Sequence, residues 1–353
     1  MMITVTNQPW KILIVDDDED IHDVTVLTLK RLLFDNRSLQ FLHAYSAKEA
    51  HDALIEHPDT AVALVDVVME AESAGLDLVK IIRDKLKNES IRIILRTGYP
   101  GLAPEESVTL AYDINDYRGK TELTAQSLKT VVITALRSFK SLVTIQNLNN
   151  EIDETQRELI YSLSEIAESR GTDIGKHVQR VGAISAFIAS KMGFKDDELD
   201  NIHLAASMHD IGKMAINDSI LNKPGKLTPE EFEHMKKHCE YGYEILRYSE
   251  RKLLKTAATI AYEHHENFDA SGYPRGLKGD EINLISRIVA LVDVFDALAT
   301  KRVYKDIWAQ DEILDFIRSQ TGIKFDPDIV SVFFENLAEI NMIIDKIQQT
   351  DNN

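Results

Sequence analysis

Short apolar runs alternate with amphipathic stretches over the first 125 or so residues. KILIVD, AVALVD and IRIILRTG are rich in β-branched residues, as are strands buried on both faces of a parallel sheet. The stretches VTVLTLKRLLF and SAKEAHDALIEH have helical periodicity, and Ser46 is placed to cap the second. Strands that alternate with helices predict a doubly wound α/β domain over residues 1–125.

A long uninterrupted helical pattern follows, and it predicts a linker helix over residues 126–168. Apolar positions spaced alternately three and four residues apart form a stripe with two polar members, as in a coiled coil. The stripe consists of Ile145, Leu148, Ile152, Thr155, Leu159, Ser162 and Ile166. Such a helix either packs on its own domain or pairs between two subunits. We favour the second reading slightly, which predicts a homodimer through the linker helix.

The remainder of the chain is helical in pattern, with one interruption rich in Gly and Pro, ENFDASGYPRGLKGDEI. This pattern predicts an all-helical domain over residues 169–345. The last residues, 346–353, end in QQTDNN and are expected to form a flexible tail. The predicted fold is therefore multidomain, α/β followed by all-α.

Composition and net charge limit the classes of protein and of ligand to be considered. The hydrophobic fraction of 44% and charged fraction of 28% are typical of a globular protein, and no apolar run reaches membrane-spanning length. The lone cysteine, Cys239, cannot form an internal disulfide, so we expect a reducing cytoplasm and an ordinary thiol. A net charge of −18 argues against broad binding to nucleic acid or anionic membrane. An anionic small substrate would need local cations.

Acidic residues follow two of the predicted strands. Asp16 and Asp17 end the first strand and Asp66 ends AVALVD, so all three are expected at the carboxyl edge of the sheet, where ligands bind. Clustered carboxylates favour a hard cation such as magnesium. Thr97 and Lys120 are expected at the same edge. Hydroxyl, ammonium and metal together suit phosphoryl transfer onto Asp66.

This segment, over roughly residues 10–125, resembles the receiver domain of two-component response regulators. The resemblance implies a five-stranded, flavodoxin-like parallel sheet and a cognate sensor histidine kinase as partner. It also implies that Asp66 accepts the phosphoryl group and that magnesium binds there. The implied magnesium ligands are Asp16, Asp17 and Asp66, and the implied switch residues are Thr97, Tyr117 and Lys120.

Five of the eleven histidines occur with other ligand-type groups on separate helical segments. His209 and Asp210 lie inside the apolar run AASMHDIGKMAI, where unsatisfied ionisable groups would be costly. The full set is Asp173, His177, His209, Asp210, His238, His264, His265 and Asp293. Imidazoles and carboxylates together suit first-row metals, and the set is too large for one ion. Buried ion pairs are the costlier alternative. We therefore predict two or three divalent ions, with iron or manganese expected.

The order of these residues resembles the HD-GYP group of the HD phosphohydrolases, over about residues 155–340. The matching segments are HVQRV, HDIGK, HHENFDASGYPRGLKGDEI, ALVDVFDALATKRVYK and GIKFDPDIV, with His238 between them. The resemblance implies metal-dependent hydrolysis of cyclic di-GMP to the linear dinucleotide, to GMP, or to both. A pair of metals can generate a bridging hydroxide and stabilise both oxygens of a phosphodiester displacement.

Within that resemblance, Asp210 is the expected bridge between metals. His177, His209 and Asp293 would complete the coordination of one metal ion. The second histidine group would bind the other ion or ions. Asp173 stands where some members have a ligand to a third ion. The second histidine group is His238, His264 and His265, the catalytic residues would be His209, Asp210 and Lys213, and the phosphate-binding cations Lys213, Arg302 and Lys305.

The sequence thus predicts a response regulator whose phosphorylated receiver controls a cyclic di-GMP phosphodiesterase. Two alternatives stay open. One is a catalytically weak signalling module that binds metal and nucleotide and acts through protein contacts. The other is a hydrolase of a different cyclic dinucleotide, such as a mixed one.

Overall fold

The computed structural model describes residues 8–98, 112–120, 124–168, 174–299 and 308–349. The chain divides into two compact units, Met1–Ile152 and Asp153–Asn353, which are described separately below. The predicted domain limits of 1–125, 126–168 and 169–345 stay predictions. No helix among the described residues is long and apolar enough to cross a membrane.

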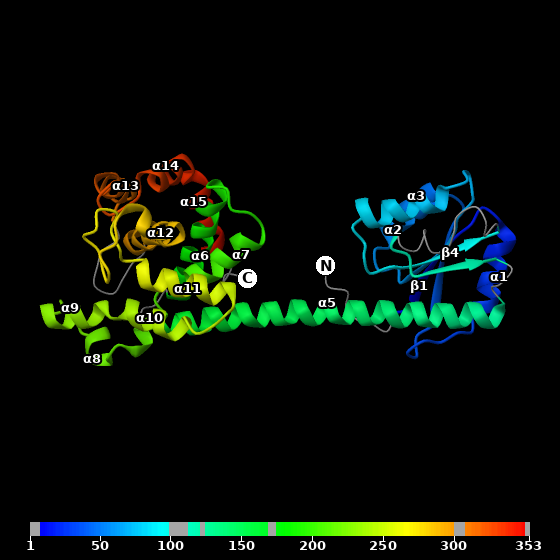
Figure 1. The fold of residues 1–353 in the computed structure, drawn as a ribbon, viewed down its shortest axis with the longest axis horizontal. Helices are drawn as coiled ribbons and strands as arrows, with labels where there is room; N and C mark the ends of the chain where they lie inside the picture. Colours follow the sequence, from blue (N-terminus) through cyan, green and yellow to red (C-terminus); the bar gives the residue numbers. More distant parts are fainter. Residues whose placement is uncertain (1–7, 99–111, 121–123, 169–173, 300–307, 350–353) are drawn as a thin grey trace. The chain divides into compact units, whose positions relative to one another are not determined.

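A parallel five-stranded sheet in the order β2-β1-β3-β4-β5 forms the centre of unit 1, as predicted (Figure 1). This order is that of flavodoxin-like folds. The strands are β1 (Trp10–Val15), β2 (Leu39–Ala44), β3 (Val62–Asp66), β4 (Arg92–Thr97) and β5 (Asp116–Gly119).

Helices cover both faces of the sheet because the strands present apolar side chains on both faces. Leu13 and Val65 pack with α2 and α3 on one face, and Ile12 and Ile14 pack with α1 and α5 on the other. The predicted cap is confirmed, since the Ser46 hydroxyl accepts a hydrogen bond from the Glu49 backbone at 3.2 Å. The helical elements are α1 (Glu19–Leu29), α2 (Ala47–Glu56), α3 (Ala74–Lys80), a π-helical turn (Ile81–Lys85) and α5 (Ala125–Glu168).

Unit 2 is helical, and its described residues form no extended strand, which confirms the predicted fold class. Apolar faces of α6, α7, α11 and α12 meet in one core that includes Ile184, Ala205, Ile260 and Val289. The longer helices are α6 (Ile174–Lys191), α7 (Asp197–Ser207), α9 (Pro229–Lys236), α10 (His238–Leu246), α11 (Lys252–Glu263), α12 (Leu284–Ala299), α13 (Gln310–Ser319), α14 (Pro327–Glu335) and α15 (Leu337–Gln349). The short ones are η2 (Ile211–Ala215), α8 (Asp218–Leu221) and η3 (Gly279–Glu281).

The predicted linker helix forms as α5, and its apolar stripe lies at the surface. Ile145, Ile152 and Leu159 are each more than half exposed. Another face of the same helix packs into unit 2, where Ser164 and Ala167 are buried. Packing within either unit, among the residues that the structure describes, therefore does not account for the stripe, and pairing between subunits stays a prediction.

The predicted tail begins too early. Helix α15 continues through residues 346–349, and the Lys176 ammonium donates a hydrogen bond to the carbonyl of Gln348 at 3.1 Å. The helix continues because no Gly or Pro stops it and because a cation satisfies a carbonyl of its last turn.

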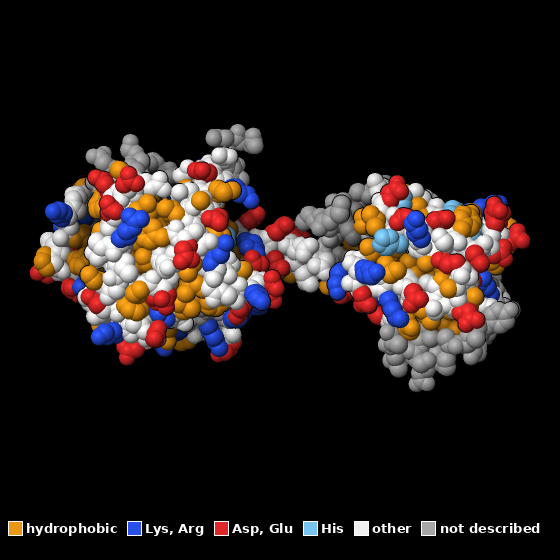
Figure 2. Space-filling view, turned by 90° about the horizontal axis from the view of Figure 1, so that it is seen from above, with side chains coloured by type: hydrophobic (Ala, Val, Ile, Leu, Met, Phe, Trp, Pro, Cys, Tyr) orange, Lys and Arg blue, Asp and Glu red, His pale blue; other side chains and the backbone are white. Residues whose placement is uncertain are grey.

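Charged side chains of both signs are interspersed with apolar ones over the surface drawn in Figure 2. On this face the acidic side chains are spread out rather than gathered in one patch.

Candidate metal centre

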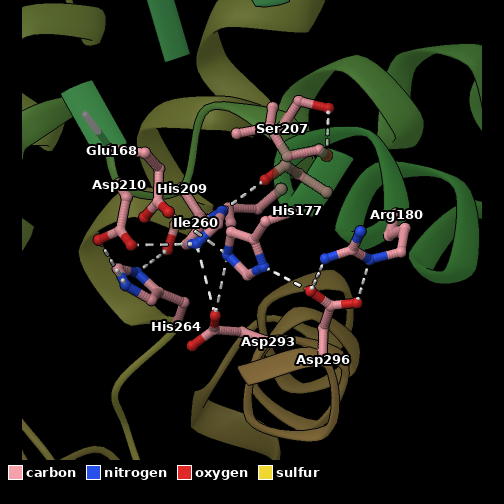
Figure 3. A network of polar contacts seen from close by, with 12 residues as sticks. Glu168, His177, Arg180, Ser207, His209, Asp210, Ile260, His264, Asp293 and Asp296 are labelled. Atoms are coloured by element: carbon pink, nitrogen blue, oxygen red, sulfur yellow. Dashed lines mark hydrogen bonds and ion pairs between the residues drawn. The ribbon is translucent and has the colours of Figure 1, made fainter. Parts of the chain in front are cut away.

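Three helices and the turns after two others deliver imidazoles and carboxylates to one buried point in unit 2 (Figure 3). All seven predicted ligands that the structure describes take part. His177 lies in α6, His209 and Asp210 between α7 and η2, His238 at the start of α10, His264 and His265 directly after α11, and Asp293 in α12. Asp173, Arg302 and Lys305 lie outside the described residues.

Asp210 lies between two groups of imidazoles. Its Oδ2 is 3.2 Å from His209 Nε2, and its Oδ1 is 3.2 Å from His238 Nε2 and 3.7 Å from His264 Nε2. One carboxylate therefore faces both groups, as a bridging ligand must.

Within each group the side-chain atoms lie as close together as ligands of one metal ion would. On one side of Asp210, the Oδ1 atom of Asp293 is 3.5 Å from His177 Nε2 and 3.7 Å from His209 Nε2. On the other side, His238 Nε2 and His264 Nε2 are 3.4 Å apart, and His265 joins them within ligand range. Hereafter these are called the His177–His209 half and the His238–His264 half.

The hydrogen bonds of the imidazoles show that the site fits a metal. His209 Nδ1 lies 2.9 Å from the carbonyl of Ala206, and His238 Nδ1 lies 2.8 Å from that of Met235. His264 Nδ1 likewise faces main-chain carbonyls at 3.1 Å. A carbonyl accepts, so Nδ1 carries the proton, and Nε2 of the neutral imidazole presents a lone pair toward Asp210.

Ligand atoms at this point have no hydrogen-bond partner among the described residues although they are fully buried. They are His177 Nε2, His209 Nε2 and Asp210 Oδ1. Buried polar atoms without partners are costly, and a bound cation is what satisfies convergent lone pairs. The donor set of nitrogen and carboxylate oxygen suits first-row metals.

Protonation differs between the two halves. Burial alone would lower the pKa of His209, but the carboxylates of Asp210 and Asp293 outweigh it and raise that pKa to about 9. Burial lowers the pKa of His238 to about 4 despite Asp210. In the metal-free protein the His177–His209 half therefore holds a proton at neutral pH, and His238 is neutral and ready to bind a metal.

Asp296, which the sequence analysis missed, holds His177 in place. Its Oδ2 accepts a hydrogen bond from His177 Nδ1 at 2.7 Å, and its two oxygens accept from Arg180 at 2.6 and 2.9 Å. All three residues are buried. Asp296 lies three residues after Asp293, on the same face of α12, and this spacing was the available signal.

Two more residues at the centre were not singled out. Glu168 ends α5, and its carboxylate lies within ligand range of His177 and His209. Cys239 is buried, as expected of an ordinary core thiol, but its Sγ is 3.5 Å from His238 Nε2. Burial raises the pKa of this thiol.

The Gly-Tyr-Pro loop borders the His238–His264 half. The ring of Tyr273 lies 4.9 Å from that of His265, and its backbone N–H donates to the His265 carbonyl at 3.1 Å. A Cβ on Gly272 would meet the Asn267 backbone nitrogen at 2.2 Å, so the loop can lie this close only with glycine there.

In unit 1 the predicted acidic residues also meet at one edge of the sheet. Oxygens of Asp16, Asp17 and Asp66 lie within ligand range of one another. The Lys120 ammonium is 2.6 Å from Asp66 and 3.1 Å from Asp16. Thr97 ends β4, and its carbonyl accepts from the Lys120 N–H at 2.7 Å.

Tyr117 and Arg96 lie in the neighbouring strands β5 and β4. Tyr117 lies buried in β5, next to β4. Arg96, which was not predicted, is 3% exposed, with Nη2 3.4 Å from Asp16 Oδ2. A second cation therefore contacts the acidic cluster from inside the fold.

Comparison with known proteins agrees with this geometry. Residues 161–329 match the family described as HD domain. The chain is 32% identical to the 3'3'-cGAMP-specific phosphodiesterase 2 of Vibrio cholerae serotype O1, over 95% of this chain and 92% of that protein. It is 33% identical to a cyclic di-GMP phosphodiesterase of Thermotoga maritima, over 96% and 94%. It is 41% identical to the cyclic di-GMP phosphodiesterase response regulator RpfG of Xanthomonas campestris pv. campestris, over 55% and 51%. The chain belongs to the response regulators that join an N-terminal receiver domain to a C-terminal HD-GYP phosphodiesterase domain.

Proposed function

We propose that this protein hydrolyses a cyclic dinucleotide at the metal centre of unit 2 and that phosphorylation of Asp66 controls the rate. The observation that carries the proposal is Asp210, a buried carboxylate that faces the imidazoles of both halves. Full-length relatives whose names state phosphodiesterase activity support the same reaction class.

The chain's own residues define the reaction site. First-row metal ions, iron or manganese, would supply an activated water and charge stabilisation for the phosphodiester. Asp210 would bridge the ions, with His177, His209 and Asp293 on one side of it. His238, His264 and His265 would bind on the other side.

Lys213 supplies a fixed positive charge beside Asp210. Its ammonium is 2.5 Å from Asp210 Oδ2 and 2.9 Å from Glu168 Oε1. Burial would lower the pKa of Lys213, but these two carboxylates outweigh it and raise the pKa above its ordinary value. A lysine held protonated in this way acts through charge, and we propose that it stabilises the scissile phosphate or the leaving oxygen.

Cyclic di-GMP is the substrate that we propose. A second candidate, 3'3'-cGAMP, is favoured by the relative from Vibrio cholerae that is aligned over almost its whole length. Chromatography of the products formed from each dinucleotide by the same preparation distinguishes the two. It also shows whether the linear dinucleotide or the mononucleotide accumulates.

For unit 1 we propose that Asp66 accepts a phosphoryl group from a sensor histidine kinase, with magnesium held by Asp16, Asp17 and Asp66. Lys120 already contacts two of these carboxylates, as charge neutralisation of a phosphoryl group requires. Such a kinase would act in the cytoplasm. Acetyl phosphate and magnesium should label the wild type with one acid-labile phosphoryl group, and labelling that persists in Asp66→Asn would contradict the assignment.

We also propose that two chains pair through α5. The support is the exposed apolar stripe from Ile145 to Ile166, of which Leu148 and Ile152 are about half exposed. Light scattering of the wild type and of Ile152→Glu tests this proposal: a dimer that the substitution converts to a monomer supports it, and a monomeric wild type refutes it.

The competing reading is a binding module with slow or no turnover. Protein purified anaerobically, with its metal content measured and its activity assayed on both dinucleotides, separates the two. Full metal loading without any product would favour the module.

A further inference from the structure

Helix α5 reaches the metal centre at its last residue, Glu168. The side chain is mostly covered, with 11% of its surface exposed, and enters the network drawn in Figure 3. Its Oε1 accepts a hydrogen bond from the Lys213 ammonium at 2.9 Å. Its Oε2 is 3.7 Å from His177 Nε2. The two oxygens of one carboxylate therefore face two different parts of the site.

The ammonium of Lys213 is shared between two carboxylates. It donates to Asp210 Oδ2 at 2.5 Å and to Glu168 Oε1 at 2.9 Å. Without Glu168, the Lys213 ammonium would contact Asp210 alone, the carboxylate proposed to bridge the metals. A cation on that oxygen competes with a metal for its lone pairs, so Glu168 draws a competitor away from Asp210.

Glu168 also adds negative charge to the His177–His209 half. Its oxygen and the two imidazole nitrogens all lie within 4.8 Å of one another. This arrangement favours a divalent cation there and adds to the charge of Asp293 on the same half.

We propose that Glu168 is a positioning residue through which α5 sets the metal affinity of the His177–His209 half and the place of Lys213. The proposal rests on the proposed function for its consequence, regulation of hydrolysis. A shift of α5 by one residue moves its end about 1.5 Å. Added to the 2.9 Å contact with Lys213, this displacement exceeds hydrogen-bond range, so a small movement of α5 would release the ammonium onto Asp210.

The test compares three substitutions in α5 by titration of the metal-free full chain with Mn²⁺. Glu168→Gln removes the charge and keeps the length, whereas Glu168→Asp keeps the charge and shortens the reach. Glu158→Gln is the matched control, since Glu158 is an exposed carboxylate of the same helix. We expect both Glu168 variants to bind one Mn²⁺ equivalent, that of the His177–His209 half, roughly 10–100-fold more weakly, the range for loss of a group that supports metal ligands. The control should bind as the wild type does.

Kinetics provide the second readout. With Mn²⁺ at saturation, both Glu168 variants should show a lower kcat with little change in KM, because Lys213 is misplaced while the substrate still binds. Wild-type Mn²⁺ affinity in Glu168→Gln would overturn the proposal. Wild-type behaviour of Glu168→Asp would show that charge and not position matters, and would overturn it as well. The Mn²⁺ titration needs no substrate, so it decides the role of Glu168 even if the protein hydrolyses neither dinucleotide.

Discussion

The substitution Asp296→Asn tests how the fold prepares His177 to bind a metal. Asp296 accepts hydrogen bonds from His177 Nδ1 at 2.7 Å and from Arg180 Nε and Nη2 at 2.6 and 2.9 Å. Asparagine has the same shape but one fewer acceptor and no charge. It therefore weakens the pairing with the Arg180 guanidinium, which is 1% exposed, and no longer fixes which His177 nitrogen carries the proton.

Two magnitudes follow. Breaking a buried ion pair from one side costs about 3–5 kcal/mol of the free energy of unfolding. Loss of a partner that orients a ligand histidine weakens metal binding by roughly 10–100-fold. The second effect corresponds to about 1.4–2.8 kcal/mol, and it is distinct from the first because it appears only in metal titrations.

Denaturant unfolding of the metal-free protein measures the first effect, and Mn²⁺ titration measures the second. The double variant Arg180→Met with Asp296→Asn should recover most of the stability, because the buried guanidinium is gone, but not the metal affinity. Asp315→Asn is the matched control, since Asp315 pairs with Arg318 at the surface and is 77% exposed. If the single variant Asp296→Asn is as stable as the wild type and binds Mn²⁺ with unchanged affinity, then Asp296 does not prepare His177 to bind a metal.

Three further predictions concern protons, magnesium and α5. Because the pKa of His209 is raised to about 9, its imidazolium stabilises the metal-free fold at low pH, and this stabilisation is lost as the pH rises through 9. Mn²⁺ must displace that proton, so its affinity should rise by up to about tenfold per pH unit between pH 6.5 and 9; calorimetry showing no pH dependence there would contradict this. The substitution Arg96→Met removes a buried cation from the side of Asp16. It should lower, by roughly threefold or more, the magnesium concentration needed for half-maximal labelling of Asp66 by acetyl phosphate. A higher requirement would show instead that Arg96 supports the site. One residue inserted near Asn150 rotates the rest of α5 by about 100°, so metal content should persist while phosphorylation no longer changes the hydrolysis rate; normal regulation would mean that α5 transmits nothing by its orientation.

The sequence was sufficient to predict the sheet and which acidic residues and histidines lie together in each unit, for a physical reason. Parallel strands bring their carboxyl ends to one edge, so Asp16 and Asp66 had to meet once the strands were recognised. The histidines interrupt amphipathic or apolar helices, and a buried ionisable group needs a partner. His209 and Asp210 were therefore conspicuous before the fold was known.

The residues that were missed depend on tertiary placement. Glu168 stands in a polar stretch of a long helix and differs from other exposed-looking glutamates only because α5 ends at the metal centre. Asp296 was overlooked because Asp293 was already taken as the ligand of this helix, although the three-residue spacing puts both on one helix face. Arg96 lies in an apolar strand, where a buried cation should have suggested a carboxylate partner, but that partner, Asp16, directly follows another strand, β1.

We propose that Asp210 and the imidazoles around it hold the metals at which a cyclic dinucleotide is hydrolysed. The direct measurement is metal analysis of anaerobically purified wild type and of the His209→Ala/Asp210→Ala double variant, with product chromatography on cyclic di-GMP and 3'3'-cGAMP from the same samples. We expect metal and product in the wild type, and in the double variant the loss of most metal together with all turnover. A double variant that is depleted of metal and still hydrolyses the substrate at the wild-type rate would contradict this proposal.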